Sequence, residues 1–115
     1  MIQVICPVCG AALAPQGAAW RCVQGHCFDV ARQGYVNLLT VTQKHSRHPG
    51  DTREMVAARR AFLDAGWYAP IAKTLADLVR RFCPEAASVL DAGCGEGYYL
   101  SQLGWVPERW GIDIS

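Results

Sequence analysis

Residues 6–27 read CPVCGAALAPQGAAWRCVQGHC, and they offer five candidate metal ligands where a tetrahedral site needs four. The spacing is C-x2-C-x12-C-x3-H-C. Two residues between Cys6 and Cys9 allow a tight turn that directs both sulfur atoms toward one ion, and Gly10 can adopt the positive φ angle that closes such a turn. Pro15 and Gly17 supply turn residues between the two halves. We therefore expect a hairpin with one metal-binding turn, or knuckle, at each end.

The fourth ligand is left open by the spacing. Cys6, Cys9 and Cys22 would be joined by either His26 or Cys27, because neighbouring residues of an extended chain point to opposite sides. We favour His26, since Cys-x3-His leaves a full turn for the second knuckle. Four protein ligands close the coordination sphere, so the metal would be structural, and thiolate-rich ligands favour zinc. The alternative is a set of buried cysteines without a metal.

Composition limits the class of protein. A chain of 115 residues that is 51% hydrophobic and 18% charged makes one small globular domain or two very small ones. The net charge of +1 creates no overall field for nucleic acid, so contact with a polyanion needs a local basic patch. The start MIQVIC has no features of a secretory signal, and no apolar run approaches the ~20 residues that cross a bilayer. We expect a cytoplasmic protein with reduced thiols and no membrane partner.

Two helices are predicted in the middle of the chain. Asp51 and Glu54 resemble a capping box at the start of the first helix, and Gly66 is placed to end it. The second helix would start near Tyr68 and stop before Pro84. The residues predicted to form apolar helix faces are Met55, Ala58, Phe62 and Ala65 in the first helix and Ile71, Leu75, Leu78, Val79 and Phe82, as a buried side, in the second.

A basic connector precedes these helices. Its cationic residues, in or beside residues 39–51, are Lys44, His45, Arg47, His48 and Arg53. Such a cluster is typical of a solvated linker, and it is also suited to contact with RNA phosphates.

A glycine-rich turn follows at residues 88–103, SVLDAGCGEGYYLSQL, which reads as a strand, a turn and a helix. Loops of this kind let a ligand approach the backbone closely. A dinucleotide fingerprint would place its third glycine at Tyr98, and a Walker loop would need a lysine that is absent here, so neither NAD nor ATP is favoured.

Two acids distinguish this turn from an ordinary one. Asp91 precedes the glycines and can balance a cationic ligand. Asp113 ends a second short strand, RWGIDIS, about 20 residues further on, where a carboxylate can accept hydrogen bonds from a ribose. Together with Gly93, Gly95 and Gly97, these acids fit S-adenosylmethionine, which carries a ribose and a positive sulfonium. The alternative is a strand–turn–helix in which Asp91 only caps the turn.

Four stretches together resemble the ribosomal RNA large-subunit (guanine-N1)-methyltransferases: CPVCGAAL…CVQGHCFDVARQGYVNLL, RHPGD, EMVAARRAFLDAGWY and VLDAGCGEGYY. The resemblance implies methylation of one guanine in a 23S rRNA hairpin and a zinc module that helps to recognise RNA. It supports His26 over Cys27, and it implies that Tyr68, Gly95 and Glu96 contact S-adenosylmethionine. It also makes the basic connector part of the expected RNA-facing surface. A homodimer is kept as an open alternative.

The predicted fold is a small zinc-ribbon-like β module followed by helices and the start of an α/β class I (Rossmann-like) methyltransferase domain. The expected divisions are a zinc-binding module at residues 1–38, the connector at 39–51, and the helices with the first βαβ unit at 52–115, truncated after its second strand. The base pocket is expected beyond Ser115, so no catalytic residue is nominated. A different class of function remains open, a stand-alone zinc-ribbon module that binds RNA or protein and carries a degenerate methyltransferase remnant. A third hypothesis is a zinc-stabilised methyltransferase that acts on proteins or small molecules.

Overall fold

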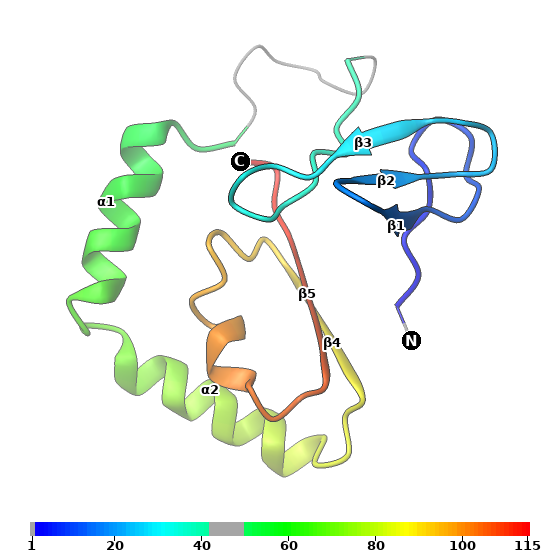
Figure 1. The fold of residues 1–115 in the computed structure, drawn as a ribbon. Coiled ribbons are helices and arrows are strands. Elements are labelled where there is room, and N and C mark those ends of the chain that lie inside the picture. Colours follow the sequence, from blue (N-terminus) through cyan, green and yellow to red (C-terminus); the bar gives the residue numbers. More distant parts are fainter. Residues whose placement is uncertain (1, 42–49) are drawn as a thin grey trace. The chain divides into compact units, whose positions relative to one another are not determined.

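The structure, a computed structural model, describes residues 2–41 and 50–115 (Figure 1). The chain divides into two compact units, Ile2–Arg47 and a second that comprises His48–Ser115. Each unit has its own sheet. The predicted cationic residues Lys44, His45, Arg47 and His48 lie outside the described residues.

The first unit is built on a three-stranded antiparallel sheet in the order β1 (Ala14–Gln16), β2 (Ala19–Arg21) and β3 (Cys27–Asp29). Gly17, with a φ of 64°, closes the turn between β1 and β2 as predicted. Pro15 was expected in that turn and lies instead within β1, opposite Trp20. Proline is tolerated there because β1 is an edge strand of the sheet.

The core of the first unit is small and formed around cysteine. Cys6, Leu13 and Cys22 are its buried residues. The partly buried residues packed against them are Val4, Ala11, Trp20, Phe28 and Leu38. So few apolar side chains cannot offset the conformational entropy of ordering this segment, which is why a metal ion is expected to complete the fold.

The second unit begins with α1 (Arg53–Asp64), which follows a different cap from the one predicted. Thr52 is the N-cap, and its hydroxyl accepts a hydrogen bond of 3.2 Å from the Met55 N–H. The side chain of Asp51, one residue earlier, pairs with Arg59 instead. Gly66, with a φ of 88°, follows the end of the helix as predicted, and its N–H donates to the Leu63 carbonyl.

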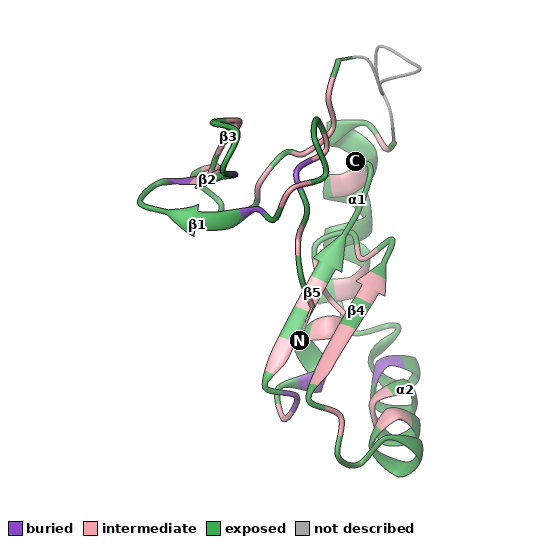
Figure 2. Ribbon diagram, turned by 90° about the vertical axis from the view of Figure 1, so that its right-hand side faces the viewer, coloured by how far each residue is buried: buried purple, intermediate pink, exposed green. Residues whose placement is uncertain are grey.

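The second helix, α2 (Ala69–Phe82), has the predicted bounds, with Pro70 in its first turn. Its predicted buried side is wrong for this chain, because Ala72 is the buried residue of α2 and most of the residues on the apolar face are exposed. Figure 2 shows most of α2 in green, the colour of exposed residues. The exposed members are Ile71, Leu75, Leu78 and Phe82. Helical periodicity identifies the apolar face correctly, but burial also requires a partner surface large enough to cover it.

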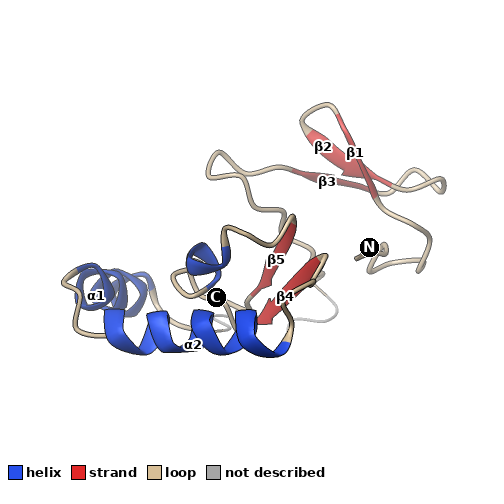
Figure 3. Ribbon diagram, turned by 90° about the horizontal axis from the view of Figure 1, so that it is seen from below, coloured by secondary structure: helices blue, strands red, loops and turns tan. Residues whose placement is uncertain are grey.

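Strands β4 (Ser88–Ala92) and β5 (Glu108–Ile112) lie side by side (Figure 3) and pair in parallel. Asp91 lies opposite Gly111 in this pair. The connection between the strands was predicted to be a helix, and it contains only the short 3-10 helix η1 (Leu100–Leu103). Gly97 has a φ of 84°, which no right-handed helix contains, so helical geometry starts after it. Gly104 and Pro107 follow soon after and leave little room for a longer helix. Among the described residues, no helix combines the length and the apolar character needed to cross a membrane.

Candidate metal centre and cofactor loop

Two knuckles hold the cysteine cluster of the first unit. In the first, the Gly10 N–H donates to the Cys6 carbonyl at 2.8 Å, and Gly10 has a φ of 74°. In the second, the Gly25 N–H donates to the Cys22 carbonyl at 3.1 Å, and Gly25 has a φ of 87°. Glycine is favoured at both positions because a side chain is strained at such φ angles. In both turns, therefore, a glycine closes the backbone on the carbonyl of the first ligand residue, Cys6 or Cys22.

The ligand atoms of Cys6, Cys9, Cys22 and His26 all lie within 4.8 Å of one another. The Cys9 and Cys22 sulfur atoms are 3.7 Å apart, and His26 Nδ1 lies 3.6 Å from the Cys6 sulfur and 3.4 Å from the Cys22 sulfur. Sulfur atoms bound to a tetrahedral zinc ion at about 2.3 Å are themselves about 3.8 Å apart. The donor set and its spacing thus fit zinc.

Cys27 lies outside this cluster. It belongs to β3, where its partner across the sheet is Arg21, and it is exposed. His26 precedes the strand and its ring turns toward Cys6 and Cys22. The structure thus brings together the four residues that the sequence favoured and leaves the fifth candidate apart.

The surroundings of Cys22 favour the ionised form of its thiol. Burial opposes its charge, but hydrogen bonds from the backbone at His26 and Gln24 and from the His26 ring outweigh burial and lower the pKa of Cys22 to about 6. A thiol must lose its proton to bind zinc, so this environment suits a ligand.

The glycine loop, residues 93–97, begins at the carboxyl end of β4 in the second unit. The N–H groups of Gly93 and Cys94 both donate to the carbonyl of Ile112, at 2.8 and 3.0 Å, which ties the loop to the end of β5. A largely open depression of about 450 Å³ lies at this edge and is lined by Gly93, Ile112, Asp113 and Ile114. Ligands of open α/β sheets bind at the carboxyl ends of the strands, which is where this depression lies.

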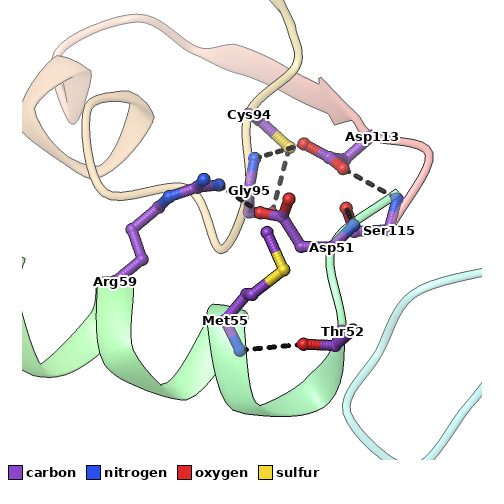
Figure 4. A network of polar contacts seen from close by, with 8 residues as sticks. All are labelled: Asp51, Thr52, Met55, Arg59, Cys94, Gly95, Asp113 and Ser115. Atoms are coloured by element: carbon purple, nitrogen blue, oxygen red, sulfur yellow. Dashed lines mark hydrogen bonds and ion pairs between the residues drawn. The ribbon is translucent and has the colours of Figure 1, made fainter.

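Asp113 connects the glycine loop to the end of the chain (Figure 4). Its Oδ2 accepts a hydrogen bond from the Gly95 N–H and its Oδ1 accepts one from the Ser115 N–H, both at 2.8 Å. The hydrogen bonds from Ser115 and Gly95 lower the pKa of Asp113, so the carboxylate is charged at neutral pH. Each oxygen keeps a second lone pair with which it can accept from a ligand hydroxyl.

Glu96 faces α1. Both of its carboxylate oxygens accept hydrogen bonds from the guanidinium of Arg60, which also lowers the pKa of Glu96. Sequence reasoning missed Arg60 because 36 residues separate the pair and nothing in the local pattern of α1 marks one arginine over another.

The loop packs closely on β5 at Gly111. A Cβ atom on Gly111 would lie 2.7 Å from the Cys94 sulfur and 3.1 Å from the Cys94 Cβ. Burial, followed by the charges of Asp91 and Asp113, raises the pKa of Cys94, so both predicted acids act on this one side chain. Gly111 was not among the predicted site residues, although a glycine inside a strand is a known signal of close approach.

Tyr68 lies in the turn between α1 and α2. Its ring packs edge-on against Phe62, with ring centroids 4.9 Å apart. The expected contact between Tyr68 and the cofactor stays a prediction.

Comparisons with known proteins agree with the metal centre of the first unit, and they find relatives along most of the chain. Residues 4–47 match the model of a zinc-ribbon family described as RlmA, N-terminal. A protein of Streptomyces fradiae named 23S rRNA (guanine(748)-N(1))-methyltransferase is 46% identical over 100 residues, which cover 85% of this chain and 35% of that protein.

Two further relatives carry the provisional name 23S rRNA (guanine-N(1)-)-methyltransferase. One from Micromonospora griseorubida is 43% identical over 95% of this chain and 42% of its own length, and YxjB of Bacillus subtilis is 36% identical over 96% and 42%. The chain thus spans about two-fifths of the length of the curated relatives that it matches. Over most of its length this chain is therefore similar to proteins named 23S rRNA (guanine-N1)-methyltransferases, and its cysteine module matches the zinc ribbon described as RlmA, N-terminal.

Proposed function

We propose that this chain is part of an enzyme that uses S-adenosylmethionine to methylate guanine N1 in a hairpin of 23S rRNA. The observation that supports this most directly is the edge of the β4–β5 sheet, where a glycine loop, Asp113 and an open depression occur together. The names of the relatives point to the same reaction.

In this proposal Cys6, Cys9, Cys22 and His26 bind one structural zinc ion. With four protein ligands the ion has no open position, so it stabilises the first unit and takes no part in the reaction. The zinc unit and the basic connector would contact the RNA backbone. The divisions at residues 1–38, 39–51 and 52–115 belong to the same proposal, in which the last segment is the start of a larger α/β domain.

The residues that would bind the cofactor are Tyr68, Asp91, Gly93, Gly95, Glu96, Gly97 and Asp113. S-adenosylmethionine, when bound, supplies a methyl group activated by its sulfonium. The Asp113 carboxylate, which the Gly95 N–H holds in place, would bind and orient the adenosine end, and the charge of Asp91 would favour the cationic sulfonium. Guanine N1 carries a proton that must leave, so a group elsewhere in the enzyme has to accept it. The reaction would take place in the cytoplasm, and a homodimer stays a prediction that sedimentation of the whole protein tests.

Calorimetric titration of S-adenosylmethionine tests the proposal. The zinc-loaded 115-residue chain is compared with the full-length gene product. Binding by the longer protein, followed by transfer of a labelled methyl group to a 23S rRNA hairpin that contains guanine, supports it. A hairpin with N1-methylguanine at the target serves as the control substrate. If the full-length protein does not bind S-adenosylmethionine, the proposal is wrong and the zinc-ribbon binding module becomes the better account.

A further inference from the structure

Polar contacts, rather than a core, hold helix α1 in the second unit. The structure describes all of Arg53–Asp64, and none of these residues is buried. The guanidinium of Arg60 pairs through Nε and Nη2 with the two carboxylate oxygens of Glu96. Arg59, its neighbour, pairs with Asp51 at 2.6 Å, in the segment just before the helix. Of these two arginines, Arg60 is the one that reaches the glycine loop.

The backbone of the glycine loop is rich in glycine, so a contact that restrains the loop from outside helps to order it. Glu96 lies between Gly95 and Gly97, which have φ angles of 56° and 84°. Glycine has more conformational freedom than any other residue, so this stretch loses more entropy than others when it is ordered. Between the two glycines, Glu96 carries the side chain by which another element can hold the loop.

The geometry of the pair between Arg60 and Glu96 suits the task of holding the loop. A guanidinium that binds both oxygens of a carboxylate fixes the orientation as well as the distance of the pair. When Glu96 is held in this way, the adjoining Gly95 is also restrained, and its N–H donates to Asp113. The contact therefore links α1, through the loop, to the acid at the end of β5.

We propose that Arg60 is a positioning residue of the cofactor site, which holds Glu96 and thereby fixes the Gly95 N–H toward Asp113. The inference rests on the proposed function. It adds Arg60 to the cofactor site, a residue of α1 for which the sequence predicted no role. Arg60 touches no reacting atom in this account, and its effect on the cofactor passes through the loop.

A double-mutant cycle in the full-length, zinc-loaded protein tests the inference. The variants are Arg60→Gln, Arg60→Lys, Glu96→Gln and the double variant Arg60→Gln with Glu96→Gln. Because exposed ion pairs have modest energies, we expect Arg60→Gln to weaken S-adenosylmethionine binding about three- to fivefold. Arg60→Lys is expected to lie between Arg60→Gln and wild type, since it keeps the charge but loses the planar fork. The double variant is expected to bind no more weakly than the weaker single variant.

Two further measurements separate positioning from general stability. Amide hydrogen exchange at Gly95, measured without cofactor, is expected to become faster in Arg60→Gln while the exchange of the β4–β5 amides is unchanged. Lys73→Gln, which removes one exposed positive charge from α2, is the matched control and is expected to bind the cofactor as wild type does.

The outcomes are distinguishable. Wild-type affinity in Arg60→Gln, or effects of Arg60 and Glu96 that simply add, would overturn the inference and leave the proposed function in place. If the wild-type protein itself fails to bind S-adenosylmethionine, the proposed function is wrong and the role of Arg60 falls with it.

Discussion

The Gly95 N–H donates a 2.8 Å hydrogen bond to Oδ2 of Asp113, so a residue of the glycine loop and the acid that follows β5 are in direct contact. They are 18 residues apart, and the parallel pairing of β4 with β5 brings them to one edge. A ligand at this edge would meet a loop amide and a carboxylate that are already oriented toward each other. Preorganisation of this kind lowers the entropy lost on binding.

Asp113→Asn is expected to weaken S-adenosylmethionine binding by the full-length protein about tenfold or more, because hydrogen bonds to charged groups contribute about 1.5–3 kcal/mol. The amide oxygen of asparagine can still accept from Gly95, so the loop keeps its position while the charge is lost. Calorimetric titration measures the change. Asp77→Asn, an exposed change on α2, is the control, and equal affinity in both variants would show that the charge of Asp113 is not used.

The contact between Asp113 and the loop has a defined pH range. The folded-state pKa of Asp113 lies below its unfolded value, so the charged carboxylate contributes its full stabilisation above about pH 5 and loses it as the pH falls below about 3.9. We expect the Gly95 amide chemical shift to be constant above about pH 5 and to titrate with a midpoint below about 3.9. In Asp113→Asn this titration should vanish. A midpoint above pH 5 in the wild type would contradict the assigned contact.

Chelation of zinc is expected to unfold the Ile2–Arg47 unit, because its buried core consists of two cysteines and one leucine. We expect one zinc ion per chain by elemental analysis, and loss of that ion in Cys6→Ser, Cys22→Ser or His26→Ala. Cys27→Ser is the matched control, since Cys27 is an exposed cysteine next to a proposed ligand. Zinc loss in Cys27→Ser together with zinc retention in His26→Ala would show that Cys27, and not His26, is the fourth ligand.

Gly111→Ala is expected to displace the glycine loop, because the new Cβ would lie 2.7 Å from the Cys94 sulfur. Overpacking of this kind costs about 1–3 kcal/mol, which urea unfolding of the second unit would measure. Adding Cys94→Ala removes the sulfur and is expected to restore part of the loss, whereas Cys94→Ala alone serves as the baseline. If the double variant is no more stable than Gly111→Ala, contact with the Cys94 sulfur is not what destabilises Gly111→Ala.

Local chemistry was the most predictable part of the molecule. The spacing of Cys6, Cys9, Cys22 and His26 indicated a common site, and the structure brings their ligand atoms together because two short knuckles determine their directions. The bounds of α2 were also predictable, since Pro70 and Pro84 mark its ends. The zinc prediction and the family resemblance agree with the comparisons.

Features that depend on residues far apart in the sequence were less predictable. Leu75 and Leu78 lie on the predicted apolar face of α2, yet both are 44% exposed because burial depends on what the rest of the structure supplies. The N-cap is Thr52 and not Asp51, since the side chain of Asp51 is engaged by Arg59. The pair between Arg60 and Glu96 joins elements that only the folded backbone brings together.

The two-stranded parallel ladder has a consequence for handling this chain. In the part of the chain that the structure describes, β4 and β5 each have one neighbouring strand, so each has an outer edge along which no further strand of the sheet lies. Apolar side chains such as Leu90 and Ile112 lie exposed on these same strands. Extended segments of other molecules can add to such edges, so aggregation of the isolated 115-residue chain should rise steeply with its concentration.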